Sequence, residues 1–504
     1  MYKLTDAIQR HPANAFAAFL ALHIVVWTAL PALFFLNLPL DLIEALVYGR
    51  EWRLGYDKLP PLPWWMVEAA YRLFGPDLFY FLLAQLTVIS AFVLVWALAR
   101  PLVGAIGALV AILIIDGLHY FTFTAPKFNH DVAQLPFWAL AGYAYWAALR
   151  HGRIMHWVLL GAAIGIAFWA KYFVVVLAVP LVLFVLLDRD ARKSLATPGP
   201  WIAAAVAFVV MAPHLVWLVR NDFPPFAYAD ARALHFKGAL DYLIKPPGFL
   251  LSQLGFLVPS LLIAAPFLRR DVRAPDQPVM SAGAFDRRIV TLLAVGPALT
   301  VTVLSLVTGR NTVAMWGYPL WLFLGLWIVM YARPIERVTL MRIVVLWGVI
   351  FTGFATVFAA AYAVRPRFEQ QRYVAVLFPG AQLGQEMSRR YRAMTGRPLA
   401  YVIGGMWDGG NIGHYAPERP RVLIDGRVSR APWIDLGDLR SRGAAVVWAD
   451  GGDPRVLPPA YRAIAGDAEI QPPFTVPFRL GTRSLTVGWA VLRPQPVVAQ
   501  APLK

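Results

Sequence analysis

The first long apolar segment of the chain is followed by Leu40-Asp-Leu-Ile-Glu-Ala-Leu-Val-Tyr-Gly-Arg-Glu-Trp-Arg-Leu-Gly-Tyr-Asp-Lys-Leu-Pro-Pro-Leu-Pro-Trp-Trp65, and this stretch guides the interpretation of the rest. Asp41 and Glu44 are three residues apart, so on a helix they lie on one face. Carboxylates at the end of a membrane span are costly unless they are paired or functional. Pro60 and Pro61 require an extended turn, and the Trp pair that follows suits a membrane–water interface. The stretch therefore predicts a structured polar loop at a membrane surface.

The composition is that of a protein with many membrane spans. Of its 504 residues, 59% are hydrophobic and 15% are charged, whereas about a quarter are charged in soluble proteins. The net charge of +17 comes from basic residues that mostly lie between apolar segments, as the positive-inside rule predicts. No nucleic-acid motif accompanies them, so we expect no nucleic-acid partner. The absence of cysteine excludes disulfides and thiolate chemistry.

The apolar segments predict a membrane all-α protein with about eleven spans, because a helix needs about 20 apolar residues to cross the bilayer. The expected spans are 14–36, 79–99, 101–118, 132–149, 156–170, 172–187, 201–219, 247–268, 289–308, 314–331 and 342–362. The first lacks a cleavage site and is expected to be an uncleaved anchor. The fifth and sixth are short and divided only by Lys171, so they can instead form one bent element.

Loop charges predict the orientation in the membrane. Lys and Arg are more numerous in the segments that lie inside when the N-terminus is cytoplasmic. Eleven spans then place the tail outside, in the periplasm of a bacterial inner-membrane protein. The Pro/Ala/Gly-rich stretch from Asp271 to Phe285 is expected to be a flexible inner loop.

Two domains are expected. Residues 1–363 form a multi-span module with a first outer loop at 37–78, and residues 364–504 form a soluble α/β domain of normal size for one core. Within the tail, the pattern predicts a helix over 381–395 that ends at Gly396. Short apolar runs between turn residues predict strands at 399–403, 421–424, 444–448 and 485–492.

The acidic pair of the first outer loop is the candidate catalytic group. Asp41 can act as a general base while Glu44 orients or activates the acceptor. A partly dry cavity would raise the pKa of such a carboxylate and make it a better base. The alternative is structural: Asp41 caps a short helix at the interface and Glu44 is solvated.

A second polar loop, Ala125-Pro-Lys-Phe-Asn-His-Asp131, precedes the fourth expected span. Lys127 can hold a phosphate oxygen as a point charge. Asn129 and Asp131 are substrate-binding candidates, or they cap the span that follows. His130 makes no zinc site, because His-x-x-x-His spacing is absent. We therefore predict no cofactor, and a divalent metal has no ligand cluster to support it.

Several cations lie on the side that the orientation places outside. Lys58, Lys127, Lys171 and Arg310 all run against the positive-inside rule, which indicates an anionic ligand such as a lipid-linked phosphate. For Lys171 alone, snorkelling of its side chain to the surface is an equal alternative. His214, in the seventh span, is expected to be a packed and hydrogen-bonded residue more often than a catalyst.

These motifs together resemble a known family. Asp41-x-x-Glu44 is followed by Glu51-Trp52, Gly55-Tyr56, Lys58 and Pro60-Pro61-Leu62, and later by Phe128-Asn129 and Lys171-Tyr172. This pattern resembles bacterial polyprenyl-phosphate-sugar-dependent glycosyltransferases of family 39 and the protein mannosyltransferase type. It is also related in plan to the lipid A aminoarabinose transferase, and the resemblance covers nearly the whole chain.

The resemblance implies a membrane glycosyltransferase of the C type, with a polyprenyl-phosphate sugar donor and an acceptor on an envelope lipid, glycan or protein. It implies that Asp41, and after it Glu44, is the base, and that Trp52, Tyr56 and Tyr172 contact substrate. The chain departs from the family at Leu59, where His or Lys often precedes the Pro pair. The alternative function is a transporter or flippase of a lipid-linked sugar, but the sequence has no inverted repeat to favour it.

Overall fold

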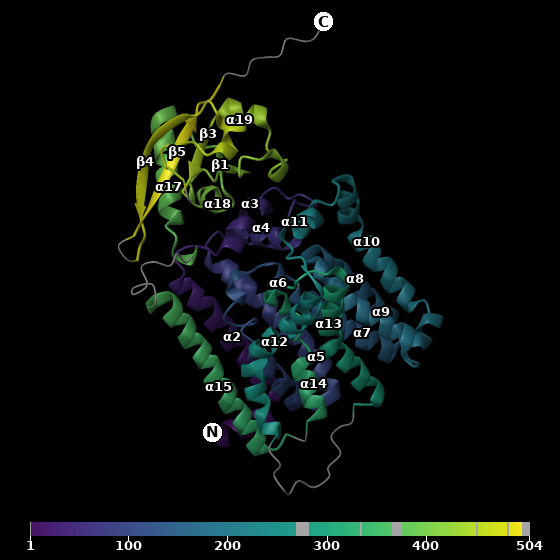
Figure 1. Ribbon diagram of the computed structural model, residues 1–504. Helices are drawn as coiled ribbons and strands as arrows, with labels where there is room; N and C mark the ends of the chain where they lie inside the picture. Colours follow the sequence, from purple (N-terminus) through teal and green to yellow (C-terminus); the bar gives the residue numbers. More distant parts are fainter. Residues whose placement is uncertain are drawn as a thin grey trace. The chain divides into compact units, whose positions relative to one another are not determined.

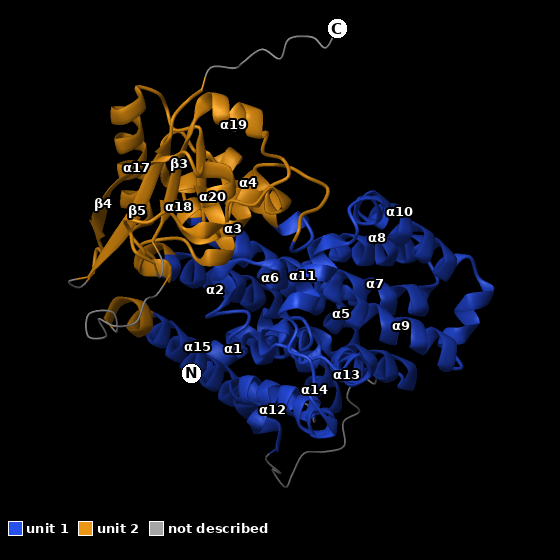
Figure 2. Ribbon diagram, turned by 45° about the horizontal axis from the view of Figure 1, so that its top comes forward, with its two compact units in different colours: residues 1–31, 58–63, 78–358 blue, residues 32–57, 64–77, 359–504 orange. Residues whose placement is uncertain are grey.

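The structure is a computed structural model that describes residues 2–268, 282–332, 335–364, 375–449, 452–480 and 483–495. It forms two compact units (Figure 2). Unit 1 comprises residues 1–31, 58–63 and 78–358, and unit 2 comprises residues 32–57, 64–77 and 359–504. Most of the first outer loop therefore folds together with the C-terminal part of the chain.

Unit 1 is helical (Figure 1). Its helices are α1 (Tyr2–Arg10), α2 (Pro12–Phe34), α5 (Leu78–Asp116), α6 (His130–Ala133), α7 (Leu135–His151), α8 (Ile154–Ala170), α9 (Val175–Leu187), α10 (Gly199–Arg220), α11 (Pro224–Arg232), α12 (Ala239–Ala264), α13 (Ala284–Thr308), α14 (Leu324–Tyr331) and α15 (Arg337–Ala359). Short 3-10 turns lie between them, including η1 (Ala125–Lys127), η2 (Tyr172–Val174) and η5 (Ala314–Gly317).

Six of the described helices are long and apolar enough to cross a membrane: Pro12–Phe34, Leu78–Asp116, Gly199–Arg220, Ala239–Leu268, Ala284–Thr308 and Arg337–Val364. Ile154–Ala170 and Tyr172–Leu187 are apolar but shorter. The structure therefore supports a mostly helical membrane fold without fixing the expected total of eleven spans.

Three of the expected spans differ from the helices of the structure. The span expected at 79–99 and all but the last two residues of that expected at 101–118 lie in α5, which is interrupted where Gly104 adopts a non-helical backbone (φ 73°, ψ 169°). The span expected at 314–331 is an α-helix only over Leu324–Tyr331 and starts with the 3-10 turn η5. The expected inner loop at 271–285 lies mostly outside the described residues, and α13 begins at its end.

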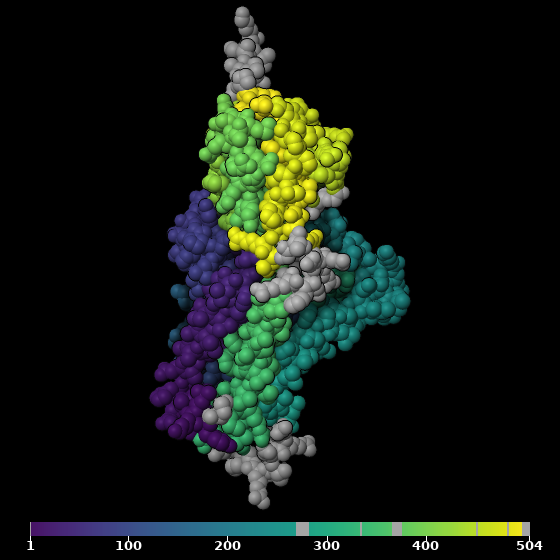
Figure 3. All heavy atoms as spheres, turned by 90° about the vertical axis from the view of Figure 1, so that its left-hand side faces the viewer, coloured from purple at the N-terminus to yellow at the C-terminus, as the bar shows by residue number. Residues whose placement is uncertain are grey.

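Polar side chains tie three helices of unit 1 together inside the bundle. The Nδ1 atom of His23 on α2 lies 2.9 Å from a carboxylate oxygen of Asp116 at the end of α5. The indole of Trp347 on α15 donates to the other oxygen of that carboxylate over 2.7 Å. Figure 3 shows α2 and α15 side by side, and Trp27 packs edge-on against Phe358. Buried charge in a membrane protein needs such partners.

Unit 2 has a five-stranded sheet in the order β2-β1-β3-β5-β4 (Figure 1). The strands are β1 (Tyr401–Gly404), β2 (Arg421–Ile424), β3 (Ala444–Trp448), β4 (Glu469–Pro477) and β5 (Ser484–Leu492). The first three are parallel, and β5 and β4 add antiparallel edges. The helices are α3 (Leu40–Gly49), α4 (Leu62–Phe74), α17 (Gly380–Thr395), α18 (Met406–Tyr415), α19 (Leu436–Arg442) and α20 (Arg462–Ala465).

The local predictions for the tail are confirmed. The expected helix is α17, and it ends where Gly396 adopts the left-handed conformation (φ 69°) that favours glycine. The four expected strands are β1, β2, β3 and β5. Leu383, Met387 and Tyr391 of α17 belong to a buried core that also includes residues of β1, β3, β4 and β5.

Candidate functional site

The acidic pair lies on α3, in unit 2. Pro39 occupies the N-cap position, and Asp41 follows in the first turn, where its charge interacts favourably with the helix dipole. The proposed capping role of Asp41 is therefore wrong. Glu44 is only 5% exposed, so the expectation that it is solvated is also wrong. Asp41 is half-buried.

Aromatic packing fixes the loop that follows α3. Tyr48 stacks on Trp64 with their ring centroids 4.3 Å apart, and Tyr56 contacts both rings edge-on. The Tyr56 hydroxyl donates to the Tyr48 carbonyl over 2.8 Å. Burial, and then the charges of Asp57 and Glu44, raise the pKa of Tyr48 well above its ordinary value. Tyr56, expected to contact substrate, is thus fully buried, with its hydroxyl engaged by the loop backbone.

Trp52, the other aromatic candidate of this loop, is placed differently. Its backbone adopts a positive φ of 46°, and its side chain is 44% exposed. The ring stacks on Trp65 at 6.1 Å, and the Arg72 guanidinium lies over it at 5.6 Å. Trp52 is therefore accessible to a partner, unlike Tyr56.

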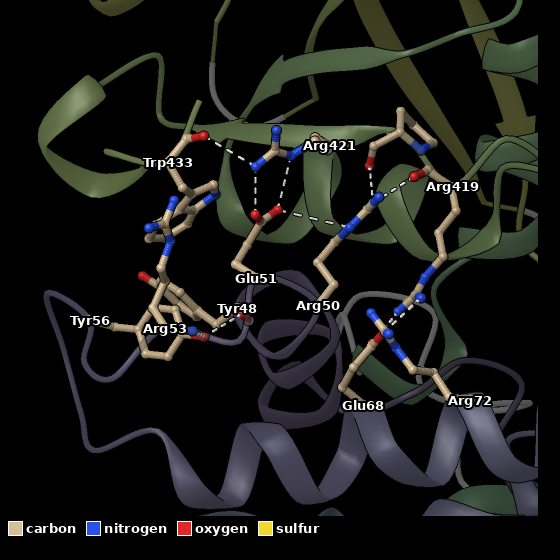
Figure 4. A network of polar contacts seen from close by, with 11 residues as sticks. Tyr48, Arg50, Glu51, Arg53, Tyr56, Glu68, Arg72, Arg419, Arg421 and Trp433 are labelled. Atoms are coloured by element: carbon tan, nitrogen blue, oxygen red, sulfur yellow. Dashed lines mark hydrogen bonds and ion pairs between the residues drawn. The ribbon is translucent and has the colours of Figure 1, made fainter. Parts of the chain in front are cut away.

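A charged network that the sequence did not indicate joins the loop helices to strand β2 (Figure 4). Arg419 donates two hydrogen bonds to Glu68 over 3.1 and 2.5 Å, and Arg421 donates two to Glu51 over 3.1 and 2.5 Å. Arg50 donates to the carbonyls of Arg419 and of the next residue. Burial, followed by the neighbouring Arg419 charge, lowers the pKa of Arg50. The partners are 351 to 370 residues apart, so no local spacing could indicate them.

In unit 1 the structure brings together two of the predicted site residues. The ammonium of Lys171 lies 2.5 Å from a carboxylate oxygen of Asp131, and these side chains are 12% and 11% exposed. Asn129 is the N-cap of α6, and its side chain accepts from the backbone N–H groups of Asp131 and Val132. Asn129 thus caps the short helix α6, whereas α7, the helix of the expected span, has Gln134 at its N-cap position. Asp131 instead forms an ion pair with Lys171. The Lys171 ammonium therefore has a carboxylate partner within the protein.

Tyr172, which follows Lys171, is held by a buried imidazole. Its hydroxyl lies 2.8 Å from Nε2 of His214, and the two rings stack. His214 is fully buried between this ring and other aromatic side chains, including Trp169 and Trp217. This matches the expectation of a packed, hydrogen-bonded histidine.

Lys58 lies in unit 1, in the same turn as Pro60, whose carbonyl contacts a second histidine. Its ammonium is 5.6 Å from the centre of the Tyr228 ring. Nε2 of His130 lies 3.0 Å from the Pro60 carbonyl oxygen. Burial lowers the pKa of His130 to about 3, and the charges of Lys171 and Lys58 act in the same direction. The imidazole is therefore neutral near pH 7.

The remaining cations have surroundings of their own. Lys127 lies half-buried in η1, and its charge, after burial, contributes to lowering the pKa of His119 to about 4. Arg310 forms an ion pair with Asp230, whose carboxylate also lies 3.6 Å from His235. Within the described ranges, no group of three or more His, Asp or Glu side chains is arranged to hold a metal ion.

The bundle also contains an apolar cavity. It has a volume of about 340 Å³ and lies between α7, α8, α9 and α10. Trp157, Leu181, Val185 and Ala203 are among its lining residues. Tyr145 is the only lining residue with a hydroxyl, and this hydroxyl donates to the Leu181 carbonyl over 2.9 Å. The wall of the cavity is therefore apolar and suits a hydrocarbon chain.

Comparison with known proteins supports the resemblance. Residues 58–217 match the family model described as dolichyl-phosphate-mannose-protein mannosyltransferase. The lipopolysaccharide core galacturonosyltransferase RgtA of Rhizobium johnstonii is 25% identical over 95% of this chain and 96% of that protein. The lipid A galacturonosyltransferase RgtD of the same organism is 30% identical, over 43% of this chain and 46% of that protein.

A solved structure has the same fold over nearly the whole chain. The crystal structure of ArnT from Cupriavidus metallidurans bound to undecaprenyl phosphate superposes with a TM-score of 0.62 at 15% identity. The superposition covers 97% of this chain and 99% of ArnT. The expected fold class, mostly helical with a small C-terminal sheet, is confirmed. This chain is therefore a glycosyltransferase with the fold of ArnT, and it is similar in sequence to RgtA and, over residues 58–217, to the dolichyl-phosphate-mannose-protein mannosyltransferases.

Proposed function

We propose that this protein transfers a sugar from a polyprenyl-phosphate donor to a hydroxyl of lipopolysaccharide or lipid A, on the periplasmic face of the inner membrane. The relatives RgtA and RgtD are named for transfer to the lipopolysaccharide core and to lipid A. The related ArnT structure is described as bound to undecaprenyl phosphate. The observation that carries the proposal is the pair of cations near α6: the half-buried Lys171 ammonium pairs with Asp131, and the charges of Lys58 and Lys171 both lower the pKa of His130.

The donor phosphate is the proposed ligand of these cations. Phosphate departs with growing negative charge, and fixed cations in a site of low dielectric stabilise that charge most. Lys58 and Lys171 are the principal candidates, with Lys127 and Arg310 as further ones. Asp131 holds the Lys171 ammonium in place, while the apolar cavity between α8, α9 and α10 suits part of a hydrocarbon chain.

The acidic loop is the proposed source of the base. Asp41 removes the proton from the acceptor hydroxyl, whose oxygen then forms a bond to the anomeric carbon. The bond from that carbon to the phosphate oxygen breaks, and polyprenyl phosphate leaves with the electron pair. A single displacement of this kind inverts the anomeric configuration. Glu44 lies one turn further along α3 and is buried, so we assign it to orienting Asp41 or the acceptor.

The test is a transfer assay with the purified protein in lipid nanodiscs. Undecaprenyl-phosphate galacturonic acid and undecaprenyl-phosphate aminoarabinose are each offered with lipid A or a lipopolysaccharide core, and the products are identified by mass spectrometry. Asp41→Asn should lower kcat about a hundredfold or more, because a general base contributes that much. Lys171→Met should instead raise the KM for the donor.

Folding must be checked separately in this experiment. Each variant is compared with wild type by size-exclusion profile and thermal unfolding. Unchanged turnover in a folded Asp41→Asn protein refutes the role of that residue. Failure of the wild type to transfer any sugar, while it moves the intact donor across vesicles, favours the transporter alternative.

A further inference from the structure

The turn at residues 58–63, which carries Lys58, contains two adjacent prolines and so has few backbone donors that could fix it. Residues 58–63 belong to unit 1, while the stretches before and after them belong to unit 2. Pro60 and Pro61 have no backbone N–H, so this turn cannot be fixed by the hydrogen bonds that such donors make. Each proline also restricts the backbone of the residue before it. Holding one carbonyl of this stiff segment therefore fixes Leu59, Pro60 and Pro61, from which Lys58 extends.

His130 provides such a hold. Its Nε2 atom lies 3.0 Å from the Pro60 carbonyl oxygen, and the imidazole is 5% exposed. A carbonyl oxygen only accepts, so Nε2 carries the proton and donates it. Pro60 is itself buried, which makes an unpaired carbonyl there costly.

The same short helix also holds the second cation. His130 is the first residue of α6, directly between Asn129, which caps the helix, and Asp131, which pairs with Lys171. One side chain of α6 thus fixes the Lys58 turn, and the next one fixes the Lys171 ammonium. Two consecutive residues of α6 therefore contact both the turn and the ammonium.

We propose that His130 is a positioning residue that, through the Pro60 carbonyl, holds Lys58 in place for the phosphate of the lipid-linked donor. This inference rests on the proposed function. His130 acts as a neutral donor of one hydrogen bond and does not contact substrate itself.

Three substitutions separate the hydrogen bond from simple packing. His130→Gln places an amide N–H near the position of Nε2, His130→Asn places it too far back, and His130→Leu removes it while it keeps most of the volume. The KM for undecaprenyl-phosphate sugar and kcat are measured for each in nanodiscs, together with inhibition by undecaprenyl phosphate alone. His156→Gln, on α8, is the matched control.

We expect His130→Leu to raise the donor KM about tenfold, since it leaves a buried carbonyl unpaired, with kcat changed less than about threefold. His130→Asn should resemble it, and His130→Gln should restore most of the affinity. Hydrogen exchange at the Lys58 and Leu59 amides should quicken in His130→Leu and stay near wild type in His130→Gln.

Several results overturn the inference. An unchanged donor KM in His130→Leu does so, and so does a loss confined to kcat. If His130→Gln behaves like His130→Leu in both kinetics and exchange, the imidazole acts by packing alone. A wild-type protein that neither transfers sugar nor binds undecaprenyl phosphate refutes the proposed function instead. Hydrogen exchange at the Lys58 and Leu59 amides then still tests whether His130 fixes the turn.

Discussion

Removal of the Arg419 guanidinium tests the charged network that joins α4 to strand β2. The Glu68 carboxylate is completely buried and accepts two hydrogen bonds from Arg419 and one from Arg72. The Arg419 guanidinium also lies 3.7 Å from the centre of the Tyr71 ring. Arg419→Met keeps much of the packing on that ring but leaves Glu68 with Arg72, whose side chain is 57% exposed.

The expected cost follows from these contacts. Breaking a buried ion pair from one side costs about 3–5 kcal/mol, because the other charge stays buried. The lost contact with Tyr71 contributes about 0.5–1 kcal/mol more. Arg72 still neutralises part of the Glu68 charge, which places the total near the lower end. We expect Arg419→Met to lower the free energy of opening around α4 by about 3 kcal/mol.

Hydrogen exchange followed by mass spectrometry is the suitable assay, because it reports opening free energies segment by segment. Peptides from 62–74 and 419–424 should exchange faster in Arg419→Met, while peptides from α8 serve as an internal reference. The double variant Glu68→Gln with Arg419→Met removes both charges and should recover about 1–2 kcal/mol. A change below about 0.5 kcal/mol in α4, or a double variant less stable than Arg419→Met, would refute the reasoning.

Two further predictions concern packing and protonation. In Gly380→Ala the new Cβ would lie 2.2 Å from Oδ1 of Asn37 and 2.3 Å from Oδ1 of Asn411. This overlap should destabilise unit 2 by about 1–3 kcal/mol, as measured by thermal unfolding. An unchanged unfolding midpoint would contradict this packing. Because the folded pKa of His130 is about 3 and its unfolded pKa about 6.5, its contribution to stability is present above pH 6.5 and is lost as pH falls toward 3. Between pH 7 and pH 5 the wild type should therefore lose about 2 kcal/mol more than His130→Gln, as measured by denaturant unfolding at both pH values, and parallel losses would show that His130 is not neutral in the fold.

The sequence predicted best what depends on neighbouring residues. Helix α17 and its end at Gly396 follow from local periodicity and a left-handed glycine. Strand β4 was missed, because Pro472 and Pro473 argue against a strand. The structure accommodates them at an edge, with a register shift between Gln471 and Phe474.

In the candidate site, too, contacts between residues far apart in the sequence could not be predicted. Lys171 and Asp131 were both singled out for their chemistry, but their pairing joins residues 40 positions apart and required the fold. The Arg419–Glu68 pair is separated by 351 residues and gave no local signal. Tyr56 was assigned by position in a motif, and burial of its ring depends on Tyr48 and other residues that pack around it. Motif position identifies a loop more readily than the role of each side chain in it.

The contact between His23 and Asp116 also bears on how the chain enters the bilayer during synthesis. Helix α2 emerges from the ribosome well before the end of α5, so a polar partner is already present when Asp116 arrives. An aspartate at membrane depth without that partner is penalised by about 2.5–3.5 kcal/mol on insertion scales. Trp347 on α15 arrives last and occupies the second carboxylate oxygen. The order of helices along the chain is thus also a workable order of assembly, in which Asp116 finds one polar partner already inserted and gains the other when α15 follows.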